Sequence, residues 1–324
     1  MTVSAEQQLS QPQIVTADNF TRAETDTYFA GFVRDGAFGR LKHNRTLVDV
    51  DHQTVVRPNR DTIYSLGLFD LDAGAVTITL PDAGGRFMSL MTVDEDHYNP
   101  VPTIYDPGAH RFTREQIGTR YVFFIVRTFV NPNDPADLAA VANLQDRIAV
   151  DQASAGSFDA PAWDQASLVQ VRNALKALHG APTVDAFGPR GAVDPIHHLI
   201  ATATGWGGNP AVDAQYASGT PERNDGTTVY RLTVKDVPVD AFWSLSVYNE
   251  EGFFEKNPQD AYSLNNITAT PDADGSFTIQ FGGCGDGVRN CLPIMPGWNY
   301  AVRMYRPSAA IVDGSWQFPK AQPV

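Results

Sequence analysis

The chain has 324 residues, of which 43% are hydrophobic and 19% are charged, and its formal net charge at pH 7 is -13. This composition is that of a globular protein, not a disordered one, and the charge argues against nucleic acid or an anionic membrane as the main partner, because both bind basic surfaces. The length allows two domains or one large β-rich domain, and the 22 prolines and 26 glycines favour a β protein with many turns over a helical bundle.

The N-terminal stretch from Met1 to Ile14 is polar and rich in glutamine. It contains neither a basic nor an apolar segment, so it does not resemble a secretory signal peptide. No apolar run approaches the roughly 20 residues of a membrane span. We therefore expect a protein without a membrane span, cytoplasmic as the sequence stands, or periplasmic if a leader has been removed.

Regular apolar patterns predict the helices and strands. Apolar residues at helical spacing predict three helices, over Thr16–Arg34, Asp134–Ile148 and Pro161–His179. A period of two, or a continuous apolar run, predicts strands in both halves of the chain, over Val76–Leu80, Phe87–Val93, Tyr121–Thr128, Tyr230–Val234, Trp243–Tyr248, Phe277–Phe281 and Tyr300–Tyr305. Two of these strands carry polar residues opposite their apolar ones, Ser244, Ser246 and Tyr248 in one and Arg303 and Tyr305 in the other.

A stretch rich in glycine and proline, Thr183 to Pro195, lies between the two strand-dominated halves and predicts a linker. It divides the chain into an N-terminal domain of residues 1–182 and a C-terminal domain of residues 183–324. Strands that follow one another without interleaved helices indicate antiparallel sheets, in a sandwich or a jelly roll. We therefore predict a mainly β protein with two antiparallel β-sandwich domains and a few packed helices.

The densest group of polar side chains runs from Arg57 to Ser65, directly before an apolar segment at residues 66–69. Only a proline and an isoleucine interrupt it. Burying so many polar groups requires many satisfied hydrogen bonds. A solvated loop has no need for a guanidinium, an amide, a carboxylate and a phenol in series. The stretch therefore predicts the lining of a functional site.

Four side chains of this stretch suggest acid–base chemistry. Asp61 would act as a general base or hydrogen-bond acceptor, and Tyr64 as a donor or acid. Arg60 or Arg57 would hold an anionic or carbonyl oxygen. A regular strand would place Asp61 and Tyr64 on opposite faces, so a common pocket requires an irregular strand entry. The alternative is a structural ion pair between Asp61 and one of the arginines, bracing a turn.

Further residues are expected to complete the pocket. His43, in a polar segment before the cluster, is the fourth catalytic candidate beside Asp61, Tyr64 and Arg60. The residues expected to bind the substrate are Asn59, Arg57, Arg127 and His97. Of these, Arg127 lies near the end of one predicted strand and His97 follows another.

The seven histidines form no His-x-His or His-Glu-x-x-His motif. A metal site built from His43, His97 and one of the adjacent pair His197 and His198 is an alternative. Ordinary hydrogen-bonded histidines are the favoured interpretation, so we expect no metal and no cofactor.

Only two cysteines are present, Cys284 and Cys291, with six residues between them. We expect them close in space, on a loop framed by the strands Phe277–Phe281 and Tyr300–Met304. A disulfide that closes a small loop and two free thiols both fit this spacing, whereas a structural zinc would need histidines from distant parts of the chain.

Several longer runs are shared with known proteins. They are His43-Asn44-Arg45, Val55 to Ser65 and Leu144-Gln145-Asp146 in the first half, and Gly205 to Pro210, Phe242-Trp243-Ser244, Gly297 to Tyr300 and Arg303 to Pro307 in the second. With these runs the chain resembles a pairing of two bacterial families, the domains of unknown function 1254 and 1214. The resemblance implies an immunoglobulin-like β-sandwich followed by a jelly-roll-like sandwich, with helices packed around them. It implies no activity, because the families have no settled one.

Two functions from different classes fit these observations. The first is an enzyme with hydrolase-like acid–base chemistry on a small molecule, in a polar pocket around Arg57 to Ser65. The second is a non-catalytic ligand-binding or assembly protein, which the absence of a nucleophile motif such as Gly-x-Ser-x-Gly favours. In both cases we expect a small-molecule ligand and no nucleic acid, and the sequence leaves the oligomeric state open, a homo-oligomer included.

Overall fold

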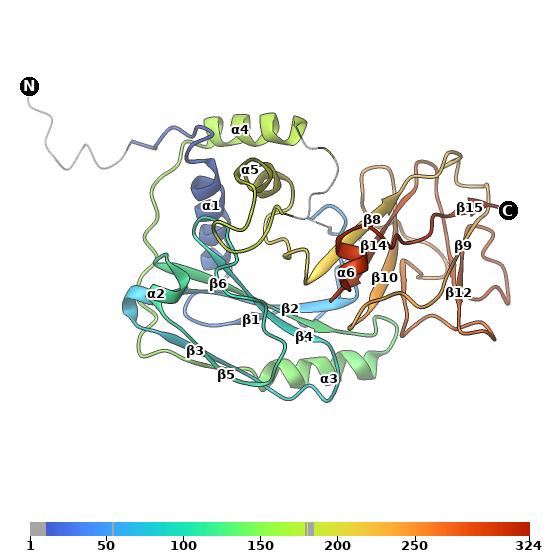
Figure 1. Cartoon of the computed structure of the whole chain (residues 1–324), viewed down its shortest axis with the longest axis horizontal. Coiled ribbons are helices and arrows are strands. Elements are labelled where there is room, and N and C mark those ends of the chain that lie inside the picture. Colours follow the sequence, from blue (N-terminus) through green and yellow to red (C-terminus); the bar gives the residue numbers. More distant parts are fainter. Residues whose placement is uncertain (1–10, 54, 179, 181–184) are drawn as a thin grey trace, which may run out of the picture. The chain divides into compact units, whose positions relative to one another are not determined.

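The structure, a computed structural model, describes residues 11–53, 55–178, 180 and 185–324 (Figure 1). This part of the chain is mainly β, with four sheets and six α-helices, which confirms the predicted fold class. It divides into two compact units. As far as the chain is described, the first unit contains residues 11–43, 64–127, 144–178, 180 and 185–210, and the second contains residues 44–53, 55–63, 128–143 and 211–324. The predicted boundary between residues 182 and 183 lies outside the described residues, as do His179 and the first two residues of the predicted linker.

Two sheets form the β part of the first unit. One has the strand order β1 (Lys42–His43), β2 (Thr62–Asp70), β6 (Tyr121–Phe129) and β4 (Met88–Asp94), and the other the order β5 (Gly108–Phe112), β3 (Val76–Leu80) and β7 (Ala149–Asp151). Side chains of both sheets share one apolar core that contains Phe69, Ile78 and Phe124. The alternation of apolar and polar residues in β3 therefore places one face against the other sheet and one face outward.

Helices cover the other face of the sheet that contains β6. They are α1 (Phe20–Arg34), α4 (Gln165–Ala177) and α5 (Pro195–Thr204), which gather on one side of that sheet in Figure 1. Phe29 of α1 packs against Phe123 of β6, and Phe20 shares a core with Leu168 and Ala203 of the other two helices. The short α2 (Arg114–Ile117) precedes β6, and α3 (Pro135–Asp146) follows it.

The apolar pattern does not predict α5, although its start has clear signals. Asp194 accepts hydrogen bonds from the backbone N–H groups of Ile196 and His197, and Pro195 occupies the first turn. The three predicted helices are present but shorter than predicted. The first begins at Phe20, after Asn19, whose side-chain oxygen accepts a hydrogen bond from the Thr16 N–H and does not cap the helix.

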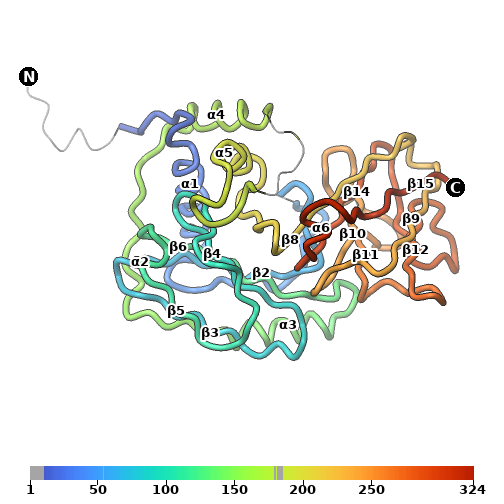
Figure 2. The backbone as a smooth tube through the Cα atoms, in the orientation of Figure 1, coloured from blue at the N-terminus to red at the C-terminus, as the bar shows by residue number. Residues whose placement is uncertain are grey.

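The second unit is a sandwich of two further sheets. One has the order β11 (Ser263–Asn265), β10 (Trp243–Tyr248), β14 (Asn299–Tyr305) and β8 (Ala214–Gly219), and the other the order β13 (Cys291–Leu292), β12 (Phe277–Phe281), β9 (Tyr230–Val234) and β15 (Gln322–Pro323). Figures 1 and 2 show β9, β12 and β15 in one layer and β8, β10 and β14 in the other. Leu245, Ile279 and Val302 lie in the core between the layers. The short helix α6 (Ala309–Val312) follows β14.

Cys284 and Cys291 are joined by a disulfide, with their Cα atoms 5.5 Å apart. Cys291 opens β13, which pairs in parallel with β12. In the part of the chain that the structure describes, no helix is long and apolar enough to cross a membrane.

Replacing both cysteines with serine should lower the free energy of unfolding by about 2–3 kcal/mol, since the closed loop is short and its closure limits the unfolded chain. Urea unfolding of wild type and the double variant measures this difference. Thiol titration of the denatured wild type without reductant should find no free thiol. Two titratable thiols would contradict the disulfide.

Candidate functional site

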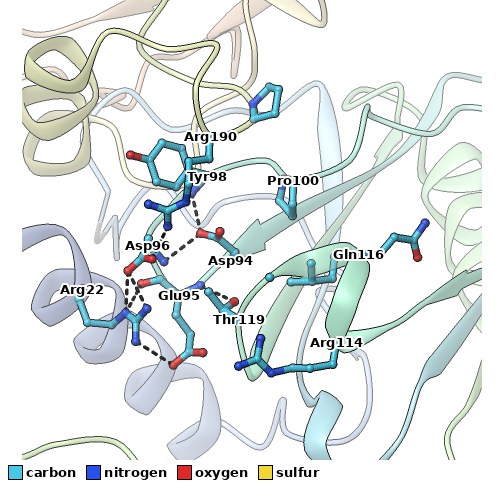
Figure 3. Close-up of a pocket in the computed structure, with 13 residues that line it drawn as sticks. Arg22, Asp94, Glu95, Asp96, Tyr98, Pro100, Arg114, Gln116, Thr119 and Arg190 are labelled. Atoms are coloured by element: carbon cyan, nitrogen blue, oxygen red, sulfur yellow. Dashed lines mark hydrogen bonds and ion pairs between the residues drawn. The ribbon is translucent and has the colours of Figure 1, made fainter.

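A pocket of about 530 Å³ lies in the first unit, at the end of β4 (Figure 3). Its volume is within the range of small-molecule sites, roughly 300–1,000 Å³. Four segments line it: the start of α1 with Arg22, the end of β4 and the following loop with Asp94, Glu95, Asp96, Tyr98 and Pro100, the segment from Arg114 to Thr119, and Pro189 with Arg190. None of these residues belongs to the predicted site.

The chain turns sharply where β4 ends, and Asp94 holds this turn. Its Oδ1 accepts hydrogen bonds from the backbone N–H groups of Asp96, at 2.9 Å, and Tyr98, at 2.8 Å. Such a side-chain to backbone turn is typical of aspartate. His97 within the turn has a positive φ of 64°. The turn fixes the Asp94 carboxyl group at the pocket wall, with Oδ1 occupied and Oδ2 making no hydrogen bond to the described residues.

Burial dominates the electrostatics of Asp94, which is only 3% exposed. It raises the pKa of the carboxyl group to about 7, and the neighbouring Asp96 raises it further. The two backbone N–H groups and Arg190 act in the opposite direction. At neutral pH the group therefore exchanges between acid and carboxylate, the condition that suits a general acid–base catalyst.

The other two carboxylates of the pocket are paired with arginines. Arg22 Nη2 lies 2.7 Å from Asp96 Oδ1, and Arg22 Nη1 lies 3.4 Å from Glu95 Oε1. Arg190 forms an ion pair with Asp96 Oδ2, and its guanidinium carbon lies 4.3 Å from the centre of the Tyr98 ring. Among the described residues Asp94 has no such partner. It is therefore the carboxyl group of the pocket that is free to act on a ligand.

The predicted cluster from Arg57 to Ser65 passes from the second unit to the first after Ile63. In the second unit, Asp61 is fully buried. Its Oδ1 accepts a hydrogen bond of 3.0 Å from Asn265 Nδ2, and its backbone N–H donates to Asn59 Oδ1 at 2.8 Å. Asn59 Nδ2 in turn donates to the Tyr305 hydroxyl. Asp61 is thus held at several points by side chains of its own unit.

Burial raises the pKa of Asp61. Four neighbours oppose this rise: the polar side chains of Asn265 and Ser244, and the positive charges of Arg303 and Arg60. Neither Asp61 Oδ2 nor Ser244 Oγ has a partner in hydrogen-bonding geometry. Ser244 nevertheless lies near enough to the carboxyl group of Asp61 to lower its pKa. We call Asp61, Ser244, Asn265 and Arg303 the Asp61 cluster.

Arg303 is the buried cation of this cluster. It donates to the carbonyl oxygen of Arg57 at 2.7 Å, to the Tyr248 hydroxyl at 2.9 Å and to Ser246 Oγ at 3.3 Å. Arg57 itself is exposed, with a positive φ of 53°. Arg60 donates to the carbonyl oxygen of Val48 and lies over the Tyr262 ring. These contacts anchor the segment before β2.

The remaining predicted residues lie in the first unit. His43 Nδ1 is 2.7 Å from Ser65 Oγ, which also accepts a hydrogen bond from Gln145. The guanidinium carbon of Arg127 lies 5.6 Å from the centre of the Tyr64 ring, and Arg127 Nη2 donates to Gly207 O. Both pairs of predicted residues therefore make contacts within the first unit, His43 with Ser65 and Tyr64 with Arg127.

His97 is buried, and both ring nitrogens have partners. Nδ1 lies 2.9 Å from Thr202 Oγ1, and Nε2 accepts a hydrogen bond of 2.8 Å from the backbone N–H of Gly207. Burial lowers the pKa of His97 well below its ordinary value, so the ring is neutral. These bonds tie the turn after β4 to α5 and to the tight turn at Gly207, next to the pocket.

One group of possible metal ligands occurs among the described residues, formed by Asp185, Asp194 and His197 with ligand atoms within 4.8 Å of one another. Asp194 caps α5, and His197 Nδ1 lies 2.7 Å from Asp185 Oδ1. Capping and this hydrogen bond account for the arrangement.

The two units define a mainly β protein built from two sandwich domains, with helices on the first. More specifically, two regions of the chain match family models that are both described as proteins of unknown function: DUF1254 matches residues 38–152 and DUF1214 matches residues 213–309. The predicted pairing of the two families, in this order, is confirmed. No curated protein matches the chain.

The fold is shared with a solved structure. The VPA0106 protein from Vibrio parahaemolyticus aligns with a TM-score of 0.71 at 18% sequence identity, over 94% of this chain and 98% of that chain. A protein from Burkholderia cenocepacia aligns with a TM-score of 0.49 at 13% identity, over 94% of this chain and 86% of that one.

Proposed function

We propose that the protein is an enzyme that performs hydrolase-like acid–base chemistry on a small polar molecule, in the pocket at the end of β4. The observation that carries this proposal is Asp94, a buried carboxyl group in a pocket of small-molecule size, with a pKa of about 7. A perturbed carboxyl group in a cleft is typical of a catalytic residue.

The chemistry follows from the two forms of Asp94. The carboxylate accepts a proton from a water or a substrate hydroxyl group, and the resulting acid returns that proton to a leaving group. Arg190 and Arg22 place positive charge beside the reacting group, which stabilises negative charge that develops on the substrate. The backbone N–H groups on Oδ1 keep the carboxyl group in place while Oδ2 reacts.

A second candidate site for the same chemistry is the predicted one. Of the predicted residues, Asp61 and Arg60 of the second unit would be catalytic there, and Asn59 and Arg57 of the same unit would bind the substrate. Its support is the raised pKa of Asp61 and the absence of an aligned partner for Asp61 Oδ2. The complete burial of Asp61 favours the Asp94 pocket, which a ligand can reach.

The disulfide between Cys284 and Cys291 bears on location. Such bonds persist in oxidising compartments, so we also propose that the protein works in one, such as the periplasm.

Two matched variants test the site. A panel of chromogenic esters, amides and glycosides first identifies a hydrolysed substrate, and kcat/KM is then measured against pH for wild type, Asp94→Asn and Asp61→Asn. We expect Asp94→Asn to lower kcat/KM by about 10²–10⁴-fold and to remove an inflection near pH 7.

The outcomes separate the candidate functions. Loss of activity in Asp61→Asn alone, with the pH profile of Asp94→Asn unchanged, would move the site to the second unit. If a substrate is hydrolysed and neither variant changes its rate, both candidate sites are wrong. If no substrate of the panel is hydrolysed, the non-catalytic binding protein becomes the favoured function.

A further inference from the structure

The charges that line the pocket differ from those of the chain as a whole. Three arginines, Arg22, Arg114 and Arg190, face three carboxyl groups there, whereas the whole chain has 37 acidic and 24 basic residues. When Asp94 carries a proton, the pocket has a net positive charge. It is therefore a place where this strongly acidic protein can accept an anion.

Two carboxylates of the pocket are already compensated, which disfavours a cationic ligand. Arg22 uses Nε and Nη2 on Asp96 and Nη1 on Glu95. Arg190 is committed to Asp96 and to the Tyr98 ring. A cation would have to break these pairs to reach Glu95 or Asp96, which is costly for paired, partly buried charges.

Arg114 is the arginine of the pocket whose ion-pair partner, Asp72, lies outside the pocket lining. Within the described residues, its Nε alone makes a polar contact, of 3.3 Å to Asp72 Oδ1, and the side chain is 46% exposed. Its two Nη groups make no hydrogen bond to the described residues, and neither does the side-chain amide of Gln116 in the same short helix. A guanidinium with both Nη groups free matches the two oxygens of a carboxylate.

Asp94 lies between Arg114 and Arg190 in the view of Figure 3, and the amide of Gln116 points away from the arginine pairs. We infer that the pocket binds a small organic acid whose carboxylate pairs with Arg114 and whose second polar group meets Asp94, and that one proton is taken up on binding. This inference names the ligand class of the proposed function and rests on it.

The proton uptake follows from the charges around Asp94. The charged groups that line the pocket with it are Glu95 and Asp96 of its own turn, Arg22 of α1, Arg114 of α2 and Arg190 of the loop before α5. Beyond them, Asp26 of α1 interacts with Glu95 and Asp96, and His198 of α5 stacks on Tyr98. An anion placed among them disfavours the Asp94 carboxylate, so the acid form donates a hydrogen bond to the ligand and a proton enters from solvent. Affinity must then fall as the pH rises above neutrality.

Titration calorimetry of the whole protein tests the inferred binding of an organic acid. The probes are malate as the anion, choline as the cation and glycerol as the neutral molecule. Each is measured at pH 6 and pH 8, in two buffers of different ionisation enthalpy. We expect malate to bind more tightly than the other two probes, with net proton uptake near pH 7. Its affinity should fall on the order of tenfold between pH 6 and pH 8.

Two variants sharpen the result. Arg114→Gln should weaken malate binding by at least about tenfold, whereas Arg111→Gln, three residues earlier and outside the pocket lining, should not. Asp94→Asn keeps a hydrogen-bond donor, so it should still bind malate but without proton uptake and without the pH dependence.

Three results would overturn the inference: no saturable malate binding at millimolar concentration, tighter binding of choline than of malate, or equal effects of the two arginine variants. Failure of this inference can be distinguished from failure of the proposed function, because binding and turnover are measured separately. Proton-linked malate binding in a protein whose turnover does not depend on Asp94 would refute the catalytic role of Asp94 and keep the ligand class. Asp94-dependent turnover of cationic substrates alone would keep the catalytic role and refute the ligand class.

Discussion

Replacing Arg303 with methionine should lower the free energy of unfolding by about 3–5 kcal/mol, the usual cost of removing one partner from a buried charge pair. The guanidinium interacts with the buried Asp61 and donates hydrogen bonds to Arg57 O and the Tyr248 hydroxyl. Methionine preserves much of the packing of the arginine stem. The variant therefore removes mainly the charge and the donors that hold the segment before β2 on the sheet of β10 and β14.

Urea unfolding measures this loss, and Arg231→Met is the matched control. Arg231 is exposed on β9 of the same unit and donates only to Gln280 Oε1. Its replacement should cost about 1 kcal/mol or less. Equal losses in the two variants would show that Arg303 does not stabilise the Asp61 cluster.

The second large effect is a dependence of stability on pH that Asp94→Asn removes. The pKa of Asp94 rises from 3.8 to about 7 on folding, so the folded state binds its proton more tightly than the unfolded state does. The stabilisation from this proton is complete below pH 3.8 and is lost as the pH rises through 7. A shift of about three pH units corresponds to about 4 kcal/mol, and the stability of Asp94→Asn relative to wild type should rise by this amount between pH 4 and pH 8.

Asp26→Asn is an internal comparison for this experiment. Burial raises the pKa of Asp26 to about 6, opposed by the hydrogen bond from Trp163. The proton on Asp26 also stabilises the folded state, and this stabilisation is also lost as the pH rises. The loss is complete about one pH unit lower than for Asp94, and the change in the free energy of unfolding is smaller. If the free energies of unfolding of wild type and Asp94→Asn changed with pH in parallel, the raised pKa of Asp94 would be contradicted.

Local patterns were sufficient to predict most of the fold. The period of two in β3, β9, β10 and β14 reflects one face packed on a second sheet, and such alternation is visible in sequence. The start of α5 was missed because the helix has only 10 residues and follows a stretch rich in glycine and proline. Asp194-Pro195, a capping residue followed by proline, was the available signal.

The candidate sites were harder to predict, for a physical reason. Asp61 stands out because its polar neighbours are adjacent in sequence, and the polar faces of β10 and β14, with Ser244 and Arg303, were the signal for its partners. Asp94 depends on burial and on Arg22, Arg114 and Arg190, which only the fold brings together. In the sequence, the pocket is indicated only by three consecutive acidic residues at the end of a predicted strand, Asp94, Glu95 and Asp96.

The most direct test of the acid–base role is the titration of the Asp94 carboxyl carbon by NMR, with Asp94→Asn to assign the signal. We expect a midpoint near pH 7, as burial of the carboxyl group requires. Added malate should move this midpoint upward, since an anion beside the group favours its acid form. A midpoint near pH 4, the ordinary value for aspartate, would show that Asp94 is a plain carboxylate at neutral pH and would contradict the proposed catalytic role.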